Sequence, residues 1–402
     1  MSPVPPPENP AERADALHSG LARFPAAVFQ FDPRMCSGWL SDRYFVRTQA
    51  TLAHAGRDPV VTMQVFAKKQ GVLAGVYEAV RLIQTQTLPG FDHREIEVRT
   101  LLEGDAVNRE GADAWEPVMH LTGRYRGFAH LETPLLGVLA RRSLIASNTR
   151  TVVEAARGKP VIFMAPRHDD WRVQTPDGYA AQVGGAQSVS SDAAGAWWGV
   201  PGVGTMPHAM IAAFGGDTVE ATLAFARYLR DEEPHVQVMS LVDYQNDVVE
   251  TSLAVARAMR AEFGDGKLSA VRVDTSERLI DESLLRDPEL WGRAKLTGVN
   301  AYLVRKLRAA LDAEGFGYVG IVVSGGFTPA RIRQFEAERV PVAAYGIGSS
   351  LLGHSDGTGG LINDFDYTAD LVTVDGRAES KIGRKHRDNP RMVTVDWERA
   401  DG

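Results

Sequence analysis

Short apolar runs in the middle of the chain end in, or are followed at once by, residues that can bind or transfer charged groups. These residues are Arg167, His168, Thr205, His208, Asp243, Arg272, Asp274, Ser324-Gly325-Gly326 and Gly346-Ile347-Gly348-Ser349. In parallel α/β folds the carboxyl ends of the strands meet at one edge and hold the ligand, however far apart they are in the sequence. We therefore expect one site lined by cations, carboxylates and two glycine-rich turns.

The two glycine turns have the layout of a phosphate site. Ser324-Gly325-Gly326 ends one apolar run and precedes a helix with Pro329 in its first turn, and Gly346-Ile347-Gly348-Ser349 has the same layout. Glycine turns at helix starts expose backbone N–H groups, and the helix dipole adds positive potential. Such a turn alone is most often a simple tight turn, and the neighbouring pair leaves a phosphate site and two simple tight turns as equal alternatives.

The charged residues each allow two interpretations. His208 follows Gly204-Thr205-Met206-Pro207 and is either a turn histidine or a nucleophile or base facing a phosphate. Arg167 and Arg272 can grip anions with their guanidinium forks or form structural ion pairs. Asp274 can pair with Arg272, hold ribose hydroxyls, or meet a Mg²⁺ carried by a substrate phosphate. The basic residues of the segment 381–387 are a further anion site or a solvated surface.

Strands and helices must alternate to bring these residues together. The apolar runs are 161–165, 202–206, 236–242, 270–273, 319–323 and 342–345, and helices are expected at 218–230, 247–263, 299–313 and 329–337. Continuous apolar strands that alternate with helices indicate a parallel sheet covered by helices. The pattern suits a barrel or an open doubly wound sheet and does not choose between them.

The first third of the chain has a different pattern of polar and apolar residues. Strands are expected at 59–66, 95–100 and 117–125, and helices at 41–55, 72–84 and 135–157. The strand 59–66 is rich in β-branched residues, and polar and apolar residues alternate in 95–100, with 117–125 similar, which is typical of an antiparallel sheet with one solvated face. The alternation returns at 370–375, so we expect the last fifty residues to rejoin the first sheet.

Composition excludes several classes of protein. The 402 residues carry a net charge of −7, with 24 % charged and 44 % apolar residues, which argues against a disordered chain and against a nucleic-acid binder. No apolar run approaches the ~18 residues of a membrane span. Cys36 is the only cysteine, so no intramolecular disulfide or multi-cysteine metal site can form. The proline-rich start lacks the apolar region of a signal peptide, and we expect a cytoplasmic protein.

The order and spacing of the motifs resemble the nicotinate phosphoribosyltransferase family, in its shorter, archaeal-like branch. The resemblance covers about residues 41–385. It rests on Ser41-Asp42-Arg43-Tyr44-Phe45, Arg167-His168, Thr205–Ile211 (TMPHAMI, against the family's GTMAHS), Leu241-Val242-Asp243, Val271–Asp274, Ser324–Phe327 (SGGF, against SGGL) and Gly346–Ser349.

The resemblance implies a type II phosphoribosyltransferase fold. The expected organisation is an irregular α/β barrel over 135–350, an α/β sandwich built from 13–134 and 351–402, and a disordered tail at 1–12. The implied reaction forms nicotinate mononucleotide and pyrophosphate from nicotinate and 5-phosphoribosyl-1-pyrophosphate, in NAD biosynthesis by salvage. It is coupled to hydrolysis of ATP.

The resemblance also implies roles for individual residues. His208 matches a histidine that ATP phosphorylates, and Asp274 matches a catalytic residue near the ribose hydroxyls. Substrate is expected to bind at Arg167, His168, Ser190, Thr205, Asp243 and Arg272, and the 5-phosphate at Ser324, Gly325, Gly326, Gly346, Gly348 and Ser349. Asp42 and Tyr44 match a segment that enters the neighbouring subunit's site, which implies a homodimer. Mg²⁺ is expected with the substrate phosphates and not at a metal site of the protein's own.

Departures from the family pattern leave alternatives open. His168 stands where an arginine is usual, the family's DSGD reads Asp274-Thr275-Ser276-Glu277, and its TSN reads Ser190-Ser191-Asp192. Relatives that use nicotinamide carry an aspartate near this last segment. The alternatives are nicotinamide or quinolinate as the base, or a catalytically silent paralogue that binds nucleotide.

Overall fold

The computed structural model describes residues 5–108, 115–292, 295–354 and 360–401, which divide into two compact units. The sandwich unit comprises the residues up to Arg150, 175–185, and those from Ile362 onward. The half-barrel unit comprises 151–174 and 186–361. The boundaries expected from the sequence, at 134/135 and 350/351, stay a prediction. Among the described helices, none combines the length and the apolar character that a membrane span requires.

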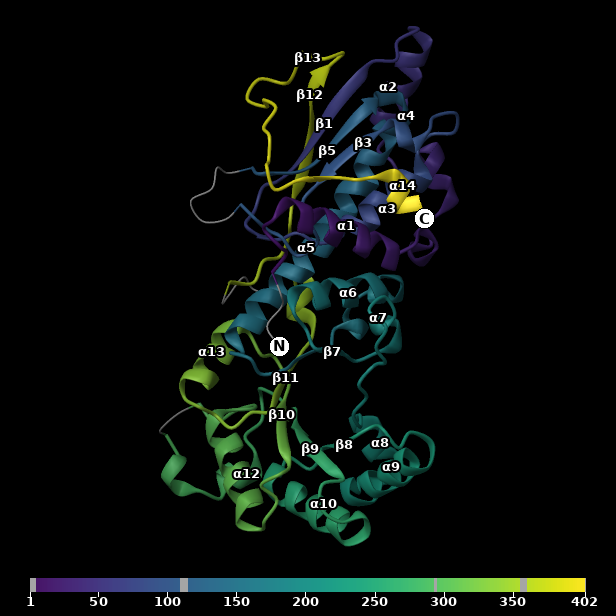
Figure 1. The fold of residues 1–402 in the computed structure, drawn as a ribbon. Helices are drawn as coiled ribbons and strands as arrows, with labels where there is room; N and C mark the ends of the chain where they lie inside the picture. The colour runs from purple at the N-terminus through teal and green to yellow at the C-terminus, as the bar shows by residue number, and fades with distance from the viewer. Residues whose placement is uncertain (1–4, 109–114, 293–294, 355–359, 402) are drawn as a thin grey trace. The chain divides into compact units, whose positions relative to one another are not determined.

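The sandwich unit contains an antiparallel sheet built from both ends of the chain (Figure 1). Its strand order within the described residues is β13-β12-β1-β5-β3-β14. The bounds are β1 Val60–Ala67, β3 Glu97–Thr100, β5 Pro117–Arg124, β12 Tyr367–Val374, β13 Arg377–Ala378 and β14 Val393–Thr394. Because β12 pairs with β1 and β14 with β3, the prediction that the last fifty residues rejoin the first sheet is confirmed.

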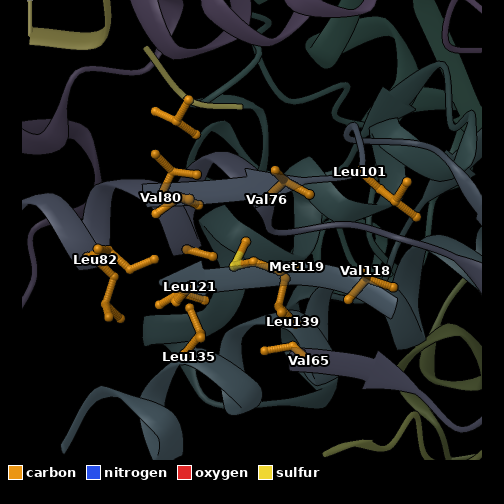
Figure 2. Close-up of a cluster of buried hydrophobic side chains, with 14 of the residues drawn as sticks. Val65, Val76, Val80, Leu82, Leu101, Val118, Met119, Leu121, Leu135 and Leu139 are labelled. Atoms are coloured by element: carbon orange, nitrogen blue, oxygen red, sulfur yellow. The ribbon is translucent and has the colours of Figure 1, made fainter. Parts of the chain in front are cut away.

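Helices cover this sheet and supply its core. The bounds are α1 Pro10–Arg23, α2 Arg43–His54, α3 Val76–Gln86, α4 Tyr125–Phe128, α5 Glu132–Ala155, α6 Gln174–Gly184 and α14 Trp397–Asp401, and a short ladder joins β2 Gly71–Val72 to β4 Ala106–Val107. Figure 2 shows the apolar cluster in which Val80 of α3 and Leu135 and Leu139 of α5 lie around Met119 and Leu121 of β5. Each of these side chains is at most 1 % exposed, which places their burial among the main stabilising terms.

Helix α1 begins inside the segment 1–12 for which a disordered tail was expected. The side chain of Asn9 accepts hydrogen bonds from the N–H groups of Ala11 and Glu12, and Pro10 occupies the first helical position. An asparagine cap followed by proline is a strong helix start. Residues 1–4 of the expected tail lie outside the described residues.

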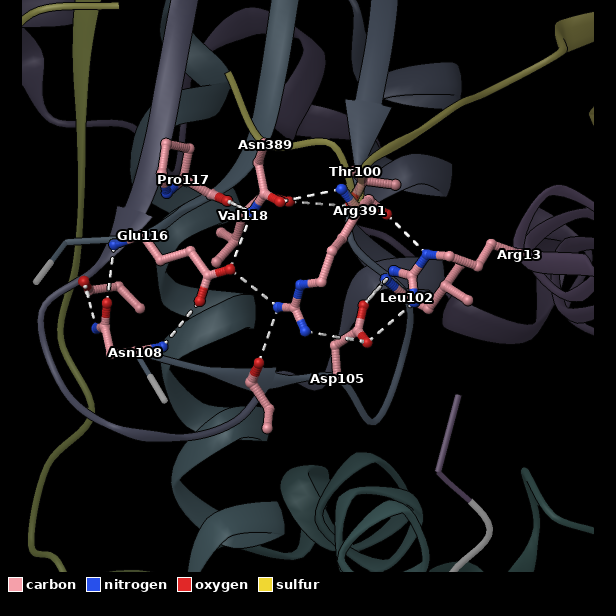
Figure 3. A network of polar contacts seen from close by, with 12 residues as sticks. Arg13, Thr100, Leu102, Asp105, Asn108, Glu116, Pro117, Val118, Asn389 and Arg391 are labelled. Atoms are coloured by element: carbon pink, nitrogen blue, oxygen red, sulfur yellow. Dashed lines mark hydrogen bonds and ion pairs between the residues drawn. The ribbon is translucent and has the colours of Figure 1, made fainter. Parts of the chain in front are cut away.

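A buried polar network ties the C-terminal segment to the sandwich unit (Figure 3). The guanidinium group of Arg13 donates to both carboxylate oxygens of Asp105, and both side chains are about 95 % buried. Arg391 lies 3.7 Å from the same carboxylate and donates to Glu116. Asn389 donates to Glu116 and to the Pro117 carbonyl. The network therefore anchors the chain directly after the basic segment 381–387.

A buried carboxylate caps α3. The two oxygens of Glu103 accept hydrogen bonds of 2.7 Å from the N–H groups of Gly75 and Val76. Burial raises the pKa of Glu103 to about 7, although these hydrogen bonds favour the ionised form.

The half-barrel unit contains a curled parallel sheet with the order β7-β6-β11-β10-β9-β8 in the part of the unit that is described. The bounds are β6 Val161–Phe163, β7 Ser188–Val189, β8 Val238–Leu241, β9 Leu268–Val273, β10 Gly320–Val323 and β11 Ala344–Ile347. The helices are α7 Asp192–Gly195, α8 His208–Ala213, α9 Thr218–Glu232, α10 Val248–Phe263, α11 Glu282–Leu285, α12 Ala301–Ala313 and α13 Pro329–Ala337. The predicted combination of an α/β barrel fold with a separate antiparallel sheet is confirmed as the fold class.

Two local predictions in this unit were wrong. The run 202–206 forms no strand: Val203 donates one backbone hydrogen bond to Val189, and the segment is otherwise irregular up to Pro207. Gly202 and Gly204 supply no side chains to pack against a sheet, and Pro207 lacks a donor. The expected turn at Gly346 is a strand position, because the pairing of β11 with β6 continues to Ile347, opposite Phe163.

Candidate active site

The carboxyl ends of the parallel strands present the predicted polar residues in sheet order. Asp243 follows β8, Asp274 follows β9, Ser324 follows β10 and Gly348 follows β11. Neighbouring strands of a parallel sheet lie about 4.8 Å apart, so consecutive ends place their side chains within contact distance. The site is built from the turns at this edge of the half-barrel unit.

Asp274 is the centre of one group of contacts. Its Oδ1 accepts a hydrogen bond of 2.8 Å from the Ser324 hydroxyl, and its Oδ2 lies 3.8 Å from the Arg272 guanidinium group. Arg272 also donates to the Met206 carbonyl at 3.3 Å, while its Nε is buried without a hydrogen-bond partner among the described residues. Asp274 is thus held in place from two sides.

His208 stands at the start of α8 and pairs with Asp243. Its Nε2 lies 3.1 Å from Asp243 Oδ2, and the histidine side chain is 46 % exposed whereas the aspartate side chain is 6 % exposed. Burial raises the pKa of Asp243, the adjacent His208 lowers it, and the nearby Asp274 raises it further. This electrostatic effect indicates that the carboxylates of Asp243 and Asp274, which follow the neighbouring strands β8 and β9, lie near each other.

The glycines of the two turns fill different structural needs. Gly325 and Gly326 have φ values of +83° and +68°, a region that other residues adopt only with strain. Gly346 and Gly348 have no such φ, but a Cβ at Gly346 would lie 2.6 Å from the Met164 sulfur and one at Gly348 2.9 Å from His168 Nε2. The turn at Gly325 and Gly326 therefore requires glycine for its conformation, whereas the strand position Gly346 and the turn position Gly348 require glycine for close approach.

The remaining residues predicted for this unit lie along the same edge. His168 ends a short turn after β6 and contacts Gly348, and burial, Arg167 and His354 all lower the pKa of His168. Arg167 is exposed and forms no ion pair with any described residue. Ser190 follows β7 and Ser349 opens the turn after β11, while Thr205 lies in the irregular segment before His208.

Asp42 and Tyr44 belong to the sandwich unit. Tyr44 is 60 % exposed, and its hydroxyl donates to Asp42 Oδ2 at 3.2 Å. The same oxygen accepts a hydrogen bond of 3.0 Å from Thr133. The structure therefore brings fourteen predicted residues to one edge of the half-barrel unit and places these two in the other unit.

The chain resembles several known phosphoribosyltransferases in sequence. Residues 42–143 match the family model described as the N-terminal domain of quinolinate phosphoribosyl transferase. The chain is 28 % identical over 395 residues to nicotinate phosphoribosyltransferase pncB1 of Mycobacterium tuberculosis, which covers 91 % of this chain and 79 % of that protein. It is 25 % identical over 289 residues to the nicotinate phosphoribosyltransferase of Bacillus subtilis, 70 % of this chain and 50 % of that protein.

Solved structures share the fold. The nicotinate-nucleotide pyrophosphorylase of Pyrococcus furiosus superposes with a TM-score of 0.69 at 27 % identity, over 91 % of this chain and 84 % of that one. These likenesses support the nicotinate phosphoribosyltransferase family for this chain. The human nicotinic acid phosphoribosyltransferase has a TM-score of 0.61 at 20 % identity, over 87 % of this chain and 77 % of that one, and shares the same fold. The predicted family is thereby supported.

The sequence analysis missed two residues near the site. Tyr244 has its ring 6.5 Å from the ring of His208, and Arg331 contacts the carbonyl groups of Gly325 and Gly326. The available signals were the position of Tyr244 directly after Asp243 and the arginine in the first helical turn after the glycine turn.

Proposed function

We propose that this chain is a nicotinate phosphoribosyltransferase, which forms nicotinate mononucleotide and pyrophosphate from nicotinate and 5-phosphoribosyl-1-pyrophosphate. The observation that carries the proposal is that two pairs, His208 with Asp243 and Asp274 with Ser324, lie at the carboxyl ends of three neighbouring strands, β8, β9 and β10. A sugar diphosphate is long enough to touch a glycine turn at one end and a histidine pair at the other. The names of the relatives from Mycobacterium tuberculosis and Bacillus subtilis support the same reaction.

The reaction depends more on electrostatic stabilisation and on the positioning of the substrates than on a protein nucleophile that attacks the ribose carbon. As pyrophosphate leaves, C1 of the ribose becomes an oxocarbenium-like cation, which a fixed carboxylate stabilises. Asp274, held by Ser324 and Arg272, is the proposed carboxylate beside the ribose. The pyridine ring and its carboxylate would lie against Arg272 and Arg167, whose guanidinium forks suit a carboxylate.

His208 is the proposed acceptor of the γ-phosphoryl group of ATP. Asp243 Oδ2 accepts the hydrogen of Nε2, which leaves the lone pair of Nδ1 available as the nucleophile. A bond forms between Nδ1 and phosphorus as the bond to the β,γ-bridging oxygen breaks, and ADP leaves with that oxygen. The phosphohistidine adds negative charge beside the site, and its hydrolysis couples ATP to product formation.

Mg²⁺ would arrive with the substrate phosphates. Among the described residues, no group of three or more His, Cys, Asp or Glu side chains is placed to hold a metal ion. Two carboxylates at the edge, Asp243 and Asp274, fit the one or two protein oxygens that a phosphate-bound magnesium ion takes. Bound there, the ion would neutralise charge on the departing pyrophosphate.

A homodimer with shared active sites completes the proposal. Tyr44 lies near Trp39 and Leu40 in the sequence, and these side chains are 60 %, 65 % and 43 % exposed. Exposed large apolar side chains beside a polar pair suit a surface that a second copy covers. We expect Asp42 and Tyr44 to enter the partner's site, in a cytoplasmic enzyme.

Quinolinate is the second candidate base, favoured by the family model matched over 42–143. Its two carboxylates would need Arg167, His168 and Arg272 together. Nicotinamide is less favoured, because the Asp192 carboxylate accepts a hydrogen bond of 2.8 Å from the Gly202 N–H and thus serves the local fold.

A substrate panel tests the proposal. The purified protein is incubated with phosphoribosyl pyrophosphate, Mg²⁺ and one of nicotinate, nicotinamide or quinolinate, with and without ATP, and nucleotide is detected by mass spectrometry. Nicotinate mononucleotide formed from nicotinate, and faster with ATP, is the expected result. Turnover of another base alone, or of none, contradicts it.

Phosphorylation is tested separately with γ-labelled ATP. We expect an acid-labile label on the wild type that disappears in His208→Ala and persists in His235→Ala, an exposed histidine of the same unit. No label on any of the three, together with no nucleotide product, identifies a silent paralogue.

A further inference from the structure

Arg331 holds the carbonyl side of the glycine turn that follows β10. It stands in the first turn of α13, and its Nη1 lies 3.3 Å from the Gly325 carbonyl oxygen and 3.5 Å from that of Gly326. Its Nη2 donates to the Val299 carbonyl, just before α12. The guanidinium carbon lies 4.3 Å from the centre of the Phe327 ring, which packs the group from one face. One side chain thus joins the turn to two helices.

The direction of these contacts determines where the turn's N–H groups point. A trans peptide carries its C=O and N–H on opposite sides, and the described chain contains no cis peptide bond. With the carbonyls of Gly325 and Gly326 facing Arg331, the N–H groups of Gly326 and Phe327 face away from it. No described residue accepts a hydrogen bond from either N–H group.

The charge of Arg331 is also uncompensated at short range. Burial lowers the pKa of its guanidinium group, and Glu277, which is exposed, opposes that shift. No described carboxylate lies within ion-pair distance of Arg331. A partly buried cation behind a turn with two unused donors increases the attraction of that turn for an anion.

We propose that Arg331 is a positioning residue for the sugar 5-phosphate: it fixes the Ser324-Gly325-Gly326 turn with its N–H groups directed at the phosphate and adds positive charge behind them. The inference rests on the proposed function for the identity of the substrate. Arg331 itself touches backbone carbonyls and not the phosphate, so its removal loosens the turn without deleting a ligand-binding group.

Arg308 provides a matched control. Its guanidinium group donates to the carbonyls of Val319 and Phe316, at 2.6 Å and 3.0 Å, just before the other end of β10. Arg308→Leu therefore removes an equivalent arginine-to-carbonyl contact just before β10, away from the site, together with an ion pair to Asp312. Arg331→Leu, Arg331→Gln and Arg331→Lys form the test series, because glutamine keeps a donor without the charge and lysine keeps the charge without the fork.

The first measurement is calorimetric binding of ribose 5-phosphate. We expect Arg331→Leu to weaken binding about tenfold or more, Arg331→Gln and Arg331→Lys to weaken it less, and Arg308→Leu to leave it within about twofold. The second is steady-state kinetics, in which KM for phosphoribosyl pyrophosphate should rise about tenfold in Arg331→Leu with kcat changed less, because the phosphate is bound alike in ground and transition states.

The outcomes separate this inference from the proposed function. Wild-type binding of ribose 5-phosphate that depends on Arg331, without turnover of any base, supports the role of Arg331 and contradicts the proposed function. Absence of ribose 5-phosphate binding by the wild type, or equal loss in the Arg331 and Arg308 variants, overturns the inference. Should Arg331→Leu fail to fold, the glutamine and lysine variants decide: unchanged binding in both overturns the inference.

Discussion

Replacement of Gly325 by alanine should lower activity through a steric contact that alanine at the neighbouring Gly326 does not make. Both residues have positive φ, so alanine at either position costs about 1–2 kcal/mol of folding free energy. A Cβ at Gly325 would also lie 3.1 Å from Asp274 Oδ1, whereas one at Gly326 would meet no atom within 4 Å. The carboxylate of Asp274 must then move by a few tenths of an ångström against its hydrogen bond from Ser324.

The comparison of the two variants isolates the displacement of Asp274. We expect both to lower Tm by a similar few degrees, at roughly 2–4 °C per kcal/mol. Only Gly325→Ala should lose about tenfold in kcat/KM for phosphoribosyl pyrophosphate, because small misplacements of catalytic groups are costly. Thermal unfolding and steady-state kinetics on both proteins provide the data. Equal losses of kcat/KM in the two variants would refute the reasoning, since strain alone would then explain the effect.

Three further predictions concern charge. The pKa of Glu103, raised from 4.5 to about 7, means that this group binds an extra proton in the folded state between these values, so its contribution to the free energy of unfolding should fall as pH rises from about 5 to 7; Glu132, with a pKa raised to about 8, contributes in the same direction, and urea unfolding at several pH values should therefore show a shallower slope in Glu103→Gln than in the wild type. Asp243→Asn should slow labelling of the site histidine by ATP about a hundredfold while Tm changes little, and unaltered labelling would exclude the carboxylate's role. Asp105→Ala leaves Arg13 buried without its partner and should cost about 3–5 kcal/mol in denaturant unfolding, whereas Asp32→Ala, at an exposed pair, should change little; equal effects would contradict the burial argument.

Much of the fold follows from patterns that short stretches of sequence carry. The apolar positions Val299, Leu303, Leu307 and Leu311 are spaced for one helix face, and all four are at most 1 % exposed in and just before α12. The strand ends were predictable for the same reason, because continuous apolar runs give way abruptly to polar or glycine residues. The return of alternation at 370–375 correctly predicted that the last fifty residues rejoin the first sheet, in which β12 pairs with β1.

The errors arise where tertiary contacts override local pattern. The run 202–206 is apolar enough for a strand, but Gly202 and Gly204 leave it a single ladder bond to Val189. The local sequence around Gly346 is typical of a turn, but the parallel pairing of β11 with β6 extends through Gly346. No pattern within one segment could reveal the pairing of Asp243 with His208, because it joins residues 35 positions apart.

Arg331 shows the same limit for the site. Its side chain acts on the backbone of a turn five and six residues earlier, and only the folded geometry of that turn directs two carbonyls toward it. The sequence indicates an arginine at a helix start, where the dipole disfavours a cation, and gives no reason for it. In the structure, the reason is the contact between the Arg331 side chain and the two backbone carbonyls of the turn.

A crystal structure with phosphoribosyl pyrophosphate and Mg²⁺ bound tests the central claim most directly. The account predicts the 5-phosphate on the N–H groups of Gly326 and Phe327, the ribose hydroxyls on Asp274, and the pyrophosphate on the side of His208. A sugar phosphate bound away from the Ser324-Gly325-Gly326 turn, or with Asp274 out of reach of the ribose, would contradict it.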